Sequence, residues 1–182
     1  DNIFFAIKGT KFDGNDFITD AISRGAKIII SERNIKLKNK QLIILKHNNP
    51  RKLLAETVYK LIKQKPKNLV AVTGTNGKSS VADFYFQILN LNLKKVASIG
   101  TLGVRLKNKK KELGNTTLDP IQLSTILKDL KRKKIEYVIM EASSHGLKQN
   151  RLDGLKFNSG IFTNLSQDHL DYHKNLDDYL KA

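Results

Sequence analysis

The 182-residue sequence predicts an α/β fold with parallel strands, arranged in two domains. Short apolar runs alternate with helical patterns, and this alternation favours parallel strands joined by crossover helices. A polar stretch at residues 65–68 (Lys-Pro-Lys-Asn) interrupts the pattern, so we expect two domains, residues 1–65 and 66–182. A composition of 40% hydrophobic and 27% charged residues can form buried cores and excludes a mainly disordered chain.

The first domain is predicted to contain three strands and two helices. The strands are expected at residues 3–7, 27–30 and 41–45, and the first helix at residues 17–24. Pro50 is expected to begin the second helix, which runs to about Gln64. The apolar residues on one face of that helix are Leu53, Leu54, Val58, Leu61 and Ile62.

The second domain repeats the alternation of strands and helices. We expect strands at residues 69–72, 96–99, 137–140 and 160–163, and helices at 78–91 and 121–131. Lys107 and the run Lys109–Lys111 are expected at the tip of a hairpin. The basic run Lys131–Lys134 is expected at a helix end, where cations suit the helix dipole.

The chain is strongly basic, with 33 Lys and Arg against 17 Asp and Glu and a net charge of +16. A basic nucleic-acid-binding module is therefore one alternative. The basic residues are 27 Lys and only 6 Arg, whereas forked recognition of bases and phosphates favours Arg. We therefore expect no nucleic-acid partner and an attraction to small anionic substrates.

The sequence also bears on the cellular location. It contains no Cys, which excludes disulfides, Cys-based zinc sites and thiolate nucleophiles. No apolar run approaches the roughly 18 residues of a membrane span, and no basic leader precedes the first apolar residues. We expect a cytoplasmic protein without a membrane partner. Because the first residue is Asp1 and not Met, we also expect a piece of a longer protein.

A glycine-rich turn between an expected strand and an expected helix is the first chemical motif. Its glycines allow backbone N–H groups to surround phosphate oxygens, Lys78 supplies a positive charge, and the Ser79 hydroxyl can ligate Mg²⁺. The common pattern G-x-x-x-x-G-K-[ST] requires a Gly where this chain has Val72, so the loop is a shorter variant. The predicted phosphate-binding residues are Gly74, Thr75, Asn76, Gly77, Lys78, Ser79 and Ser80.

Carboxylates and histidines follow two further strands. Glu141 comes at the carboxyl end of a buried strand, where ligand sites form in open α/β sheets, and it suits a divalent cation that bridges phosphate oxygens. Asp168, His169, Asp171, Tyr172 and His173 follow the last strand. His169 and His173 lie four residues apart, but no third ligand is evident and we predict no zinc site.

These motifs together resemble the Mur ligase family. The loop Gly74-Thr-Asn-Gly-Lys-Ser79 is similar to that of Mur ligases and of folylpolyglutamate synthetases. The segments Glu141-Ala-Ser-Ser-His-Gly-Leu147 and Thr163-Asn-Leu-Ser-Gln-Asp-His-Leu-Asp-Tyr-His173 resemble one Mur branch and are not shared by the synthetases. Asn115-Thr-Thr117 and the segment Asp1–Gly9 extend the similarity to essentially the whole chain.

The resemblance implies an ATP-dependent amide ligase of peptidoglycan precursor synthesis, which forms cell-wall material and so affects cell shape and division. The branch adds diaminopimelate or lysine to UDP-N-acetylmuramoyl-L-alanyl-D-glutamate through an acyl phosphate. For this chain, the resemblance implies an N-terminal UDP-substrate-binding domain without its first strand, followed by a truncated P-loop-type ATP-binding domain. A folylpolyglutamate synthetase-like or other amide ligase with the same loop remains an alternative.

The resemblance also implies roles for individual residues. ATP would lie on residues 74–80, and Mg²⁺ would be held by Ser79, Glu141 and His169. Lys78, Glu141 and His169 would be catalytic. Residues implied to contact the muramyl-peptide substrate are Thr10, Lys11, Phe12, Asn115, Thr116, Thr117, Ser143, Gln149 and Arg151. The family's carbamylated lysine and amine-selecting domain would follow Ala182, so this chain alone is expected to bind ATP without forming an amide.

Overall fold

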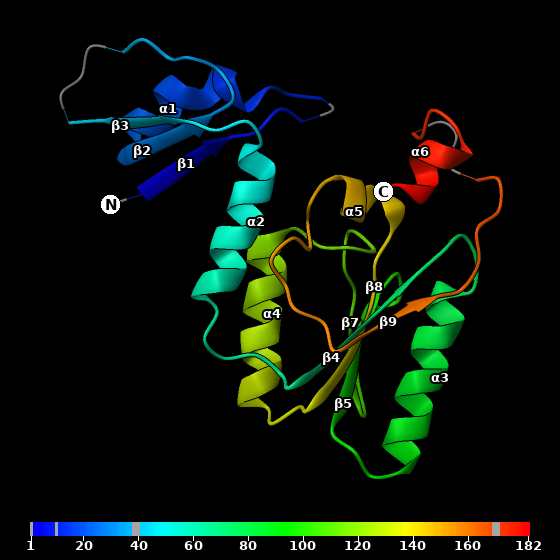
Figure 1. The fold of residues 1–182 in the computed structure, drawn as a ribbon. Helices are drawn as coiled ribbons and strands as arrows, with labels where there is room; N and C mark the ends of the chain where they lie inside the picture. Colours follow the sequence, from blue (N-terminus) through cyan, green and yellow to red (C-terminus); the bar gives the residue numbers. More distant parts are fainter. Residues whose placement is uncertain (1, 10, 38–40, 169–171) are drawn as a thin grey trace. The chain divides into compact units, whose positions relative to one another are not determined.

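The computed structural model describes residues 2–9, 11–37, 41–168 and 172–182 (Figure 1). The chain forms two compact units, residues 1–54 and residues 55–182. Among the described residues, no helix combines the length and the apolar character that a membrane crossing requires.

The first unit is built on a three-stranded parallel sheet in the order β1-β2-β3. The strands are β1 (Asn2–Ala6), β2 (Ala26–Ser31) and β3 (Ile43–Lys46). A 3₁₀ turn, η1 (Gly14–Phe17), leads into helix α1 (Ile18–Ser23). Ala6, Ile18, Ala26 and Ile29 form the small core. All three predicted strands and the predicted helix are confirmed, with ends that differ by one or two residues.

Helix α2 (Pro50–Leu61) begins in the first unit and ends in the second. The division into compact units falls within this helix, between Leu54 and Ala55, because Ala55, Tyr59 and Ile62 are buried in the core of the second unit. The domain boundary expected after Lys65 stays a prediction. The assignment of residues 1–65 to a UDP-substrate-binding domain stays a prediction.

A six-stranded sheet forms the centre of the second unit, in the order β7-β6-β5-β8-β4-β9. Its strands are β4 (Asn68–Thr73), β5 (Val96–Gly100), β6 (Gly103–Leu106), β7 (Lys109–Lys111), β8 (Tyr137–Glu141) and β9 (Ser159–Phe162). The four strands β5, β8, β4 and β9 are parallel, as predicted.

The edge formed by β6 and β7 departs from the expected parallel pairing. β6 pairs antiparallel with β5, and β7 pairs antiparallel with β6. Only two residues separate β5 from β6, which is too short for a crossover connection. The hairpin predicted around Lys107 is confirmed, although Lys109–Lys111 form its second strand. A short connection therefore made this a mixed sheet.

Helices cover both faces of this sheet (Figure 1). Alternate residues of β4 and β8 point to opposite faces, so Leu69 and Val138 belong to one core and Val70 and Ile139 to another. Helix α4 (Pro120–Arg132) contributes Leu123, Leu127 and Leu130 to the first core. Helix α3 (Lys78–Leu91) contributes Ala82 to the second.

Two short helices were not predicted from the sequence. Helix α5 (Ser144–Lys148) follows β8, and helix α6 (Leu176–Leu180) lies near the end of the chain. Each has only five residues, too few for a helical period to be recognised. Because the carboxyl ends of β5, β8, β4 and β9 lie at one edge of the sheet, the loops that follow them meet there.

Candidate functional site

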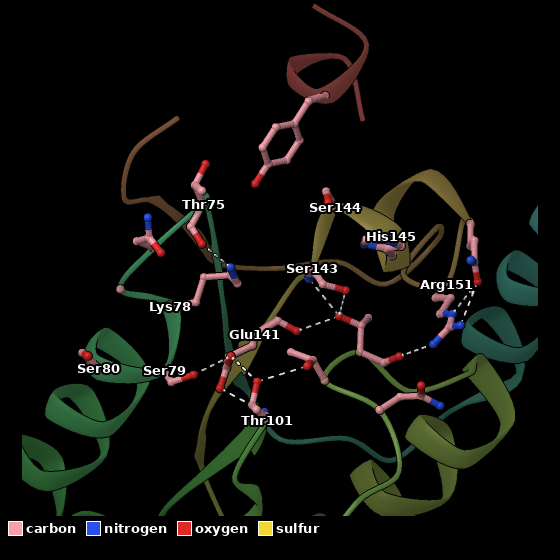
Figure 2. A pocket seen from close by; sticks show the side chains of 17 residues that line it. Thr75, Lys78, Ser79, Ser80, Thr101, Glu141, Ser143, Ser144, His145 and Arg151 are labelled. Carbon is pink, nitrogen blue, oxygen red and sulfur yellow. Dashed lines mark hydrogen bonds between the residues drawn. The ribbon is translucent and has the colours of Figure 1, made fainter. Parts of the chain in front are cut away.

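The loops at the carboxyl edge of the parallel strands enclose a pocket of about 540 Å³ in the second unit (Figure 2). The turn after β4, the end of β8, the turn after β5 and the segment before α4 all contribute to it. Its lining consists of Thr75, Asn76, Gly77, Lys78, Ser79, Ser80, Thr101, Asn115, Thr116, Thr117, Glu141, Ser143, Ser144, His145, Gln149, Arg151 and Tyr179.

The turn between β4 and α3 has the geometry of a phosphate-binding loop. Gly74 has a φ of 129° and Gly77 a φ of 83°, a region that favours glycine. Gly77 is the N-cap of the 14-residue helix α3, so the first amides of the helix and its positive dipole end face the loop. Lys78 Nζ lies 2.7 Å from the Gly74 carbonyl oxygen and 2.9 Å from that of Thr75. This arrangement suits an anionic ligand.

Glu141 forms the floor of the pocket at the end of β8. It is 4% exposed. Its Oε2 accepts hydrogen bonds from the Ser79 hydroxyl at 2.9 Å and the Thr101 hydroxyl at 3.0 Å, and its Oε1 accepts one from the Thr101 amide at 3.1 Å. A Cβ at Gly100 would lie 2.1 Å from Oε1, so only glycine leaves room for this carboxylate.

The chemistry of this floor fits a divalent cation. Within the described part of the chain, the buried Glu141 carboxylate has hydroxyl and amide donors but no cationic side chain as a partner. Ser79 and Glu141 supply oxygen atoms, which Mg²⁺ prefers, and Mg²⁺ commonly uses one or two protein ligands together with phosphates. No cluster of three His, Cys, Asp or Glu side chains occurs among the described residues. The pair therefore fits a Mg²⁺ ion that also takes phosphate oxygens as ligands.

Thr117 connects the floor of the pocket to the start of α5. Its hydroxyl lies 3.1 Å from the Glu141 carbonyl oxygen and 3.0 Å from the Ser143 hydroxyl, and it accepts a hydrogen bond from the Ser143 amide at 2.9 Å. Ser143 is the N-cap of α5 and accepts a bond from the Gly146 amide. The two side chains thus hold each other in place beside Glu141.

Arg151 supplies a positive charge on the opposite side of the pocket from the loop (Figure 2). Its guanidinium donates to Gln149 Oε1 from Nε at 3.1 Å and from Nη2 at 2.7 Å, and to the Thr117 carbonyl oxygen. The buried Tyr59 hydroxyl donates to the Arg151 carbonyl oxygen at 2.8 Å, and burial raises the pKa of this phenol well above its usual value. The guanidinium is therefore held in a defined position at the pocket, where its charge suits an anionic ligand.

Aromatic rings link α5 to the end of the chain. His145 stacks on Tyr172 with ring centroids 4.0 Å apart, and the fully buried His173 stacks on Tyr179 at 4.8 Å. Asp178 accepts hydrogen bonds from Lys148 Nζ and from the Lys174 amide, and these bonds hold the pKa of its carboxyl below the usual value. The contacts place Tyr179 at the pocket.

Most of the residues predicted for the site line this one pocket, although their roles stay predictions. Gly74 is in the loop but not in the lining. Lys11 and Phe12 belong to the first unit, where both are exposed. Thr10 and His169 lie outside the described residues. Thr101, Ser144, His145 and Tyr179 also line the pocket and were not predicted as site residues. The position of Thr101 directly after a predicted strand, and that of Ser144 and His145 within the segment Glu141–Leu147, could have indicated them.

The fold and the pocket define the class of α/β proteins that carry a glycine-rich phosphate loop at the carboxyl edge of a parallel sheet. The family profile described as "Mur ligase middle domain" matches residues 72–182, and that described as "Mur ligase family, catalytic domain" matches residues 1–68. The chain belongs to the Mur ligase family.

Named relatives agree with this membership. The chain is 46% identical over its whole length to a UDP-N-acetylmuramoyl-L-alanyl-D-glutamate--2,6-diaminopimelate ligase of Rickettsia conorii, and 42% identical over 99% of its length to that of Mesorhizobium japonicum. A solved structure of a ligase with this name superposes with a TM-score of 0.84 at 30% identity and covers 99% of the chain. The chain spans 37–38% of the length of these three relatives.

Proposed function

We propose that this chain is part of an ATP-dependent acid–amino-acid ligase of the MurE type. The substrates are UDP-N-acetylmuramoyl-L-alanyl-D-glutamate and a diamino acid, diaminopimelate or lysine, and the setting is the cytoplasm. The observation that carries the proposal is the pocket itself, in which the phosphate loop, the Ser79–Glu141 pair and the cationic Arg151 converge. The identity to ligases of this name extends along the whole chain.

Residues in different parts of the pocket would have different roles in the reaction. Lys78 and the first amides of α3 bind the triphosphate and neutralise charge on the phosphoryl group as it is transferred. Ser79 and Glu141 would hold Mg²⁺, which supplies further charge neutralisation when bound. Arg151, Asn115 and their neighbours would hold the muramyl peptide so that its free D-Glu carboxylate meets the γ-phosphate.

The chemistry then follows from this placement. The carboxylate oxygen attacks phosphorus and ADP leaves, which gives an acyl phosphate. The amine of the diamino acid attacks the acyl carbon, phosphate leaves, and an amide forms with loss of a proton from nitrogen. The pocket residues contribute mainly by orienting the two substrates, because neither step requires a covalent bond to the protein.

The test uses the full-length ligase. It is given ATP, Mg²⁺ and the UDP-muramyl dipeptide, with diaminopimelate or lysine in separate reactions, and ADP release is measured together with the product mass. We expect a product heavier by one diamino acid with one of the two amines. Saturable release of ADP with a folate-type substrate instead would favour the folylpolyglutamate synthetase alternative, and salt-dependent retention on DNA without UDP-substrate binding would favour the nucleic-acid module.

A further inference from the structure

The phosphate loop is held from outside by the segment that follows β9, residues Thr163–Ser166, which we call the clamp segment. About 90 residues separate it from the loop in the sequence. Its main chain and side chains nevertheless make hydrogen bonds to Thr73, Thr75 and Asn76. A Cβ at Gly74 would lie 2.2 Å from Thr163 Oγ1 and 2.8 Å from the Asn164 carbonyl oxygen, so the two segments touch closely.

Asn164 occupies two amides of the loop. The Thr75 amide donates to the Asn164 carbonyl oxygen at 2.9 Å, and the Asn76 amide donates to Asn164 Oδ1 at 3.1 Å. Asn164 Nδ2 donates in turn to the Asn76 carbonyl oxygen at 3.3 Å. These two amides therefore point to the clamp segment, while the first amides of α3 have no partner within their helix and remain for phosphate.

Neighbouring side chains reinforce this contact. The Thr163 hydroxyl donates to the Asn76 carbonyl oxygen at 2.7 Å. The Thr75 hydroxyl, in a residue only 5% exposed, donates to the Ser166 carbonyl oxygen at 3.2 Å and accepts from the Ser166 amide at 2.9 Å. The loop is thus hydrogen-bonded to the clamp segment at Thr73, Thr75 and Asn76, which limits the conformations that its amides can adopt.

We propose that Asn164 is a positioning residue for nucleotide binding, which fixes the phosphate loop by holding the Thr75 and Asn76 amides and leaves the amides of residues 77–80 to the phosphates. The inference rests on the proposed function, because it concerns the same phosphate site. Asn164 acts through the loop and needs no contact with the nucleotide. A loop fixed in this way does not have to be ordered when the ligand binds, so part of the affinity derives from Asn164.

The test compares Asn164→Ala with Asn158→Ala, because the two residues flank the same strand and both are exposed. Asn158 Oδ1 accepts the Leu69 amide at 2.8 Å, at the end of β4 that is remote from the loop. Affinity for ATP, inorganic tripolyphosphate and adenosine is measured by calorimetry, with thermal unfolding in parallel. We expect Asn164→Ala to weaken ATP and tripolyphosphate about tenfold and adenosine not at all, since two hydrogen bonds to the loop are lost.

The control separates positioning from stability. Asn158→Ala should lower the unfolding temperature without a change in tripolyphosphate affinity. In amide NMR spectra, added tripolyphosphate should shift the signals of residues 77–80 more than those of Thr75 and Asn76. Thr163→Val removes one hydroxyl bonded to the Asn76 carbonyl oxygen and should weaken tripolyphosphate binding about threefold. This variant replaces Asn164→Ala in the test if Asn164→Ala does not fold.

Three results would each overturn the positioning role of Asn164, and one of them would also overturn the proposed function. Equal tripolyphosphate affinity of the wild type, Asn164→Ala and Thr163→Val would overturn the positioning role and leave the proposed function intact. Equal losses with Asn164→Ala and Asn158→Ala would show a general effect of stability and would also overturn it. A wild-type chain that binds neither ATP nor tripolyphosphate would overturn the proposed function and the inference with it.

Discussion

Replacement of the buried Glu141 by Gln should separate the proposed metal-binding role of this residue from its structural role. The carboxylate accepts three hydrogen bonds, two from the hydroxyls of Ser79 and Thr101 and one from the Thr101 amide. A Gln can keep Oε1 on the Thr101 amide and turn its NH₂ to the two hydroxyls, because hydroxyls can accept as well as donate. The polar groups then stay satisfied, and the free energy of unfolding should change by no more than about 1 kcal/mol.

The effect on the metal should be much larger. An amide offers one neutral oxygen where the carboxylate offers a negative charge, and loss of even an outer partner of a metal site commonly costs roughly 10–100-fold in affinity. We therefore expect Mg·ATP affinity to fall at least about tenfold. In contrast, ATP without metal should bind equally well or more tightly, since removal of a negative charge lowers repulsion of the phosphates.

Calorimetry with ATP in excess Mg²⁺ and with ATP in a chelator provides the assay, and urea unfolding of both proteins gives the stability. In the full-length ligase, turnover should collapse while binding of the UDP-substrate persists. The reasoning would be refuted if Glu141→Gln kept its Mg·ATP affinity, or if metal-free ATP and Mg·ATP weakened equally, because either result would leave Glu141 as only a structural acceptor for Ser79 and Thr101.

Three further predictions follow from single contacts. Lys78→Ala should lower Mg·ATP affinity at least about tenfold by calorimetry and leave the circular dichroism spectrum unchanged, because this side chain points to the loop and not to the core; equal affinities would contradict its role. Gly146→Ala should lower the free energy of unfolding by about 1–3 kcal/mol in urea titrations, since the new Cβ would lie 2.6 Å from the buried Thr117 side chain, whereas Gly114→Ala has nothing within 4 Å and should not. Asp178→Asn should reduce the loss of thermal stability on acidification below about pH 4. Hydrogen bonds from Lys148 and the Lys174 amide lower the pKa of the Asp178 carboxyl in the folded protein. The stability that this carboxylate contributes is therefore present above the pKa of the unfolded chain and disappears as the pH falls through the lower pKa of the folded protein. An unchanged pH profile would show that Asp178 contributes nothing to stability.

The local features of both units could be predicted from the sequence. The strands that became β1, β2, β4, β5, β8 and β9 are apolar runs bounded by polar residues, and α3 begins at the predicted Lys78. The placement of Glu141 at the end of β8 followed from the same patterns, because a strand of known position fixes where its carboxyl end lies. These conclusions depend on residues that are neighbours in the chain.

Other features were not predictable because they depend on contacts between distant residues. The division within α2 follows from the core against which Ala55 and Tyr59 are buried. Thr101 contacts Glu141 across 40 positions of sequence. The position of Thr101 after a predicted strand places it at the same edge of the sheet, but no local pattern indicates that Glu141 is its hydrogen-bond partner.

The phosphate loop shows most clearly which features are local and which depend on the tertiary structure. Its glycines, Lys78 and Ser79 were sufficient by themselves to predict a strand-to-helix turn that binds phosphate, because backbone freedom at glycine and the charge of a lysine are local properties. Which amides of that loop are already bonded to another part of the protein was decided only by the tertiary structure, in which Asn164 lies against Thr75 and Asn76. The physical reason is that a hydrogen-bond donor can serve only the acceptor that the fold brings within about 3 Å, and here that acceptor comes from a strand end some 90 residues away.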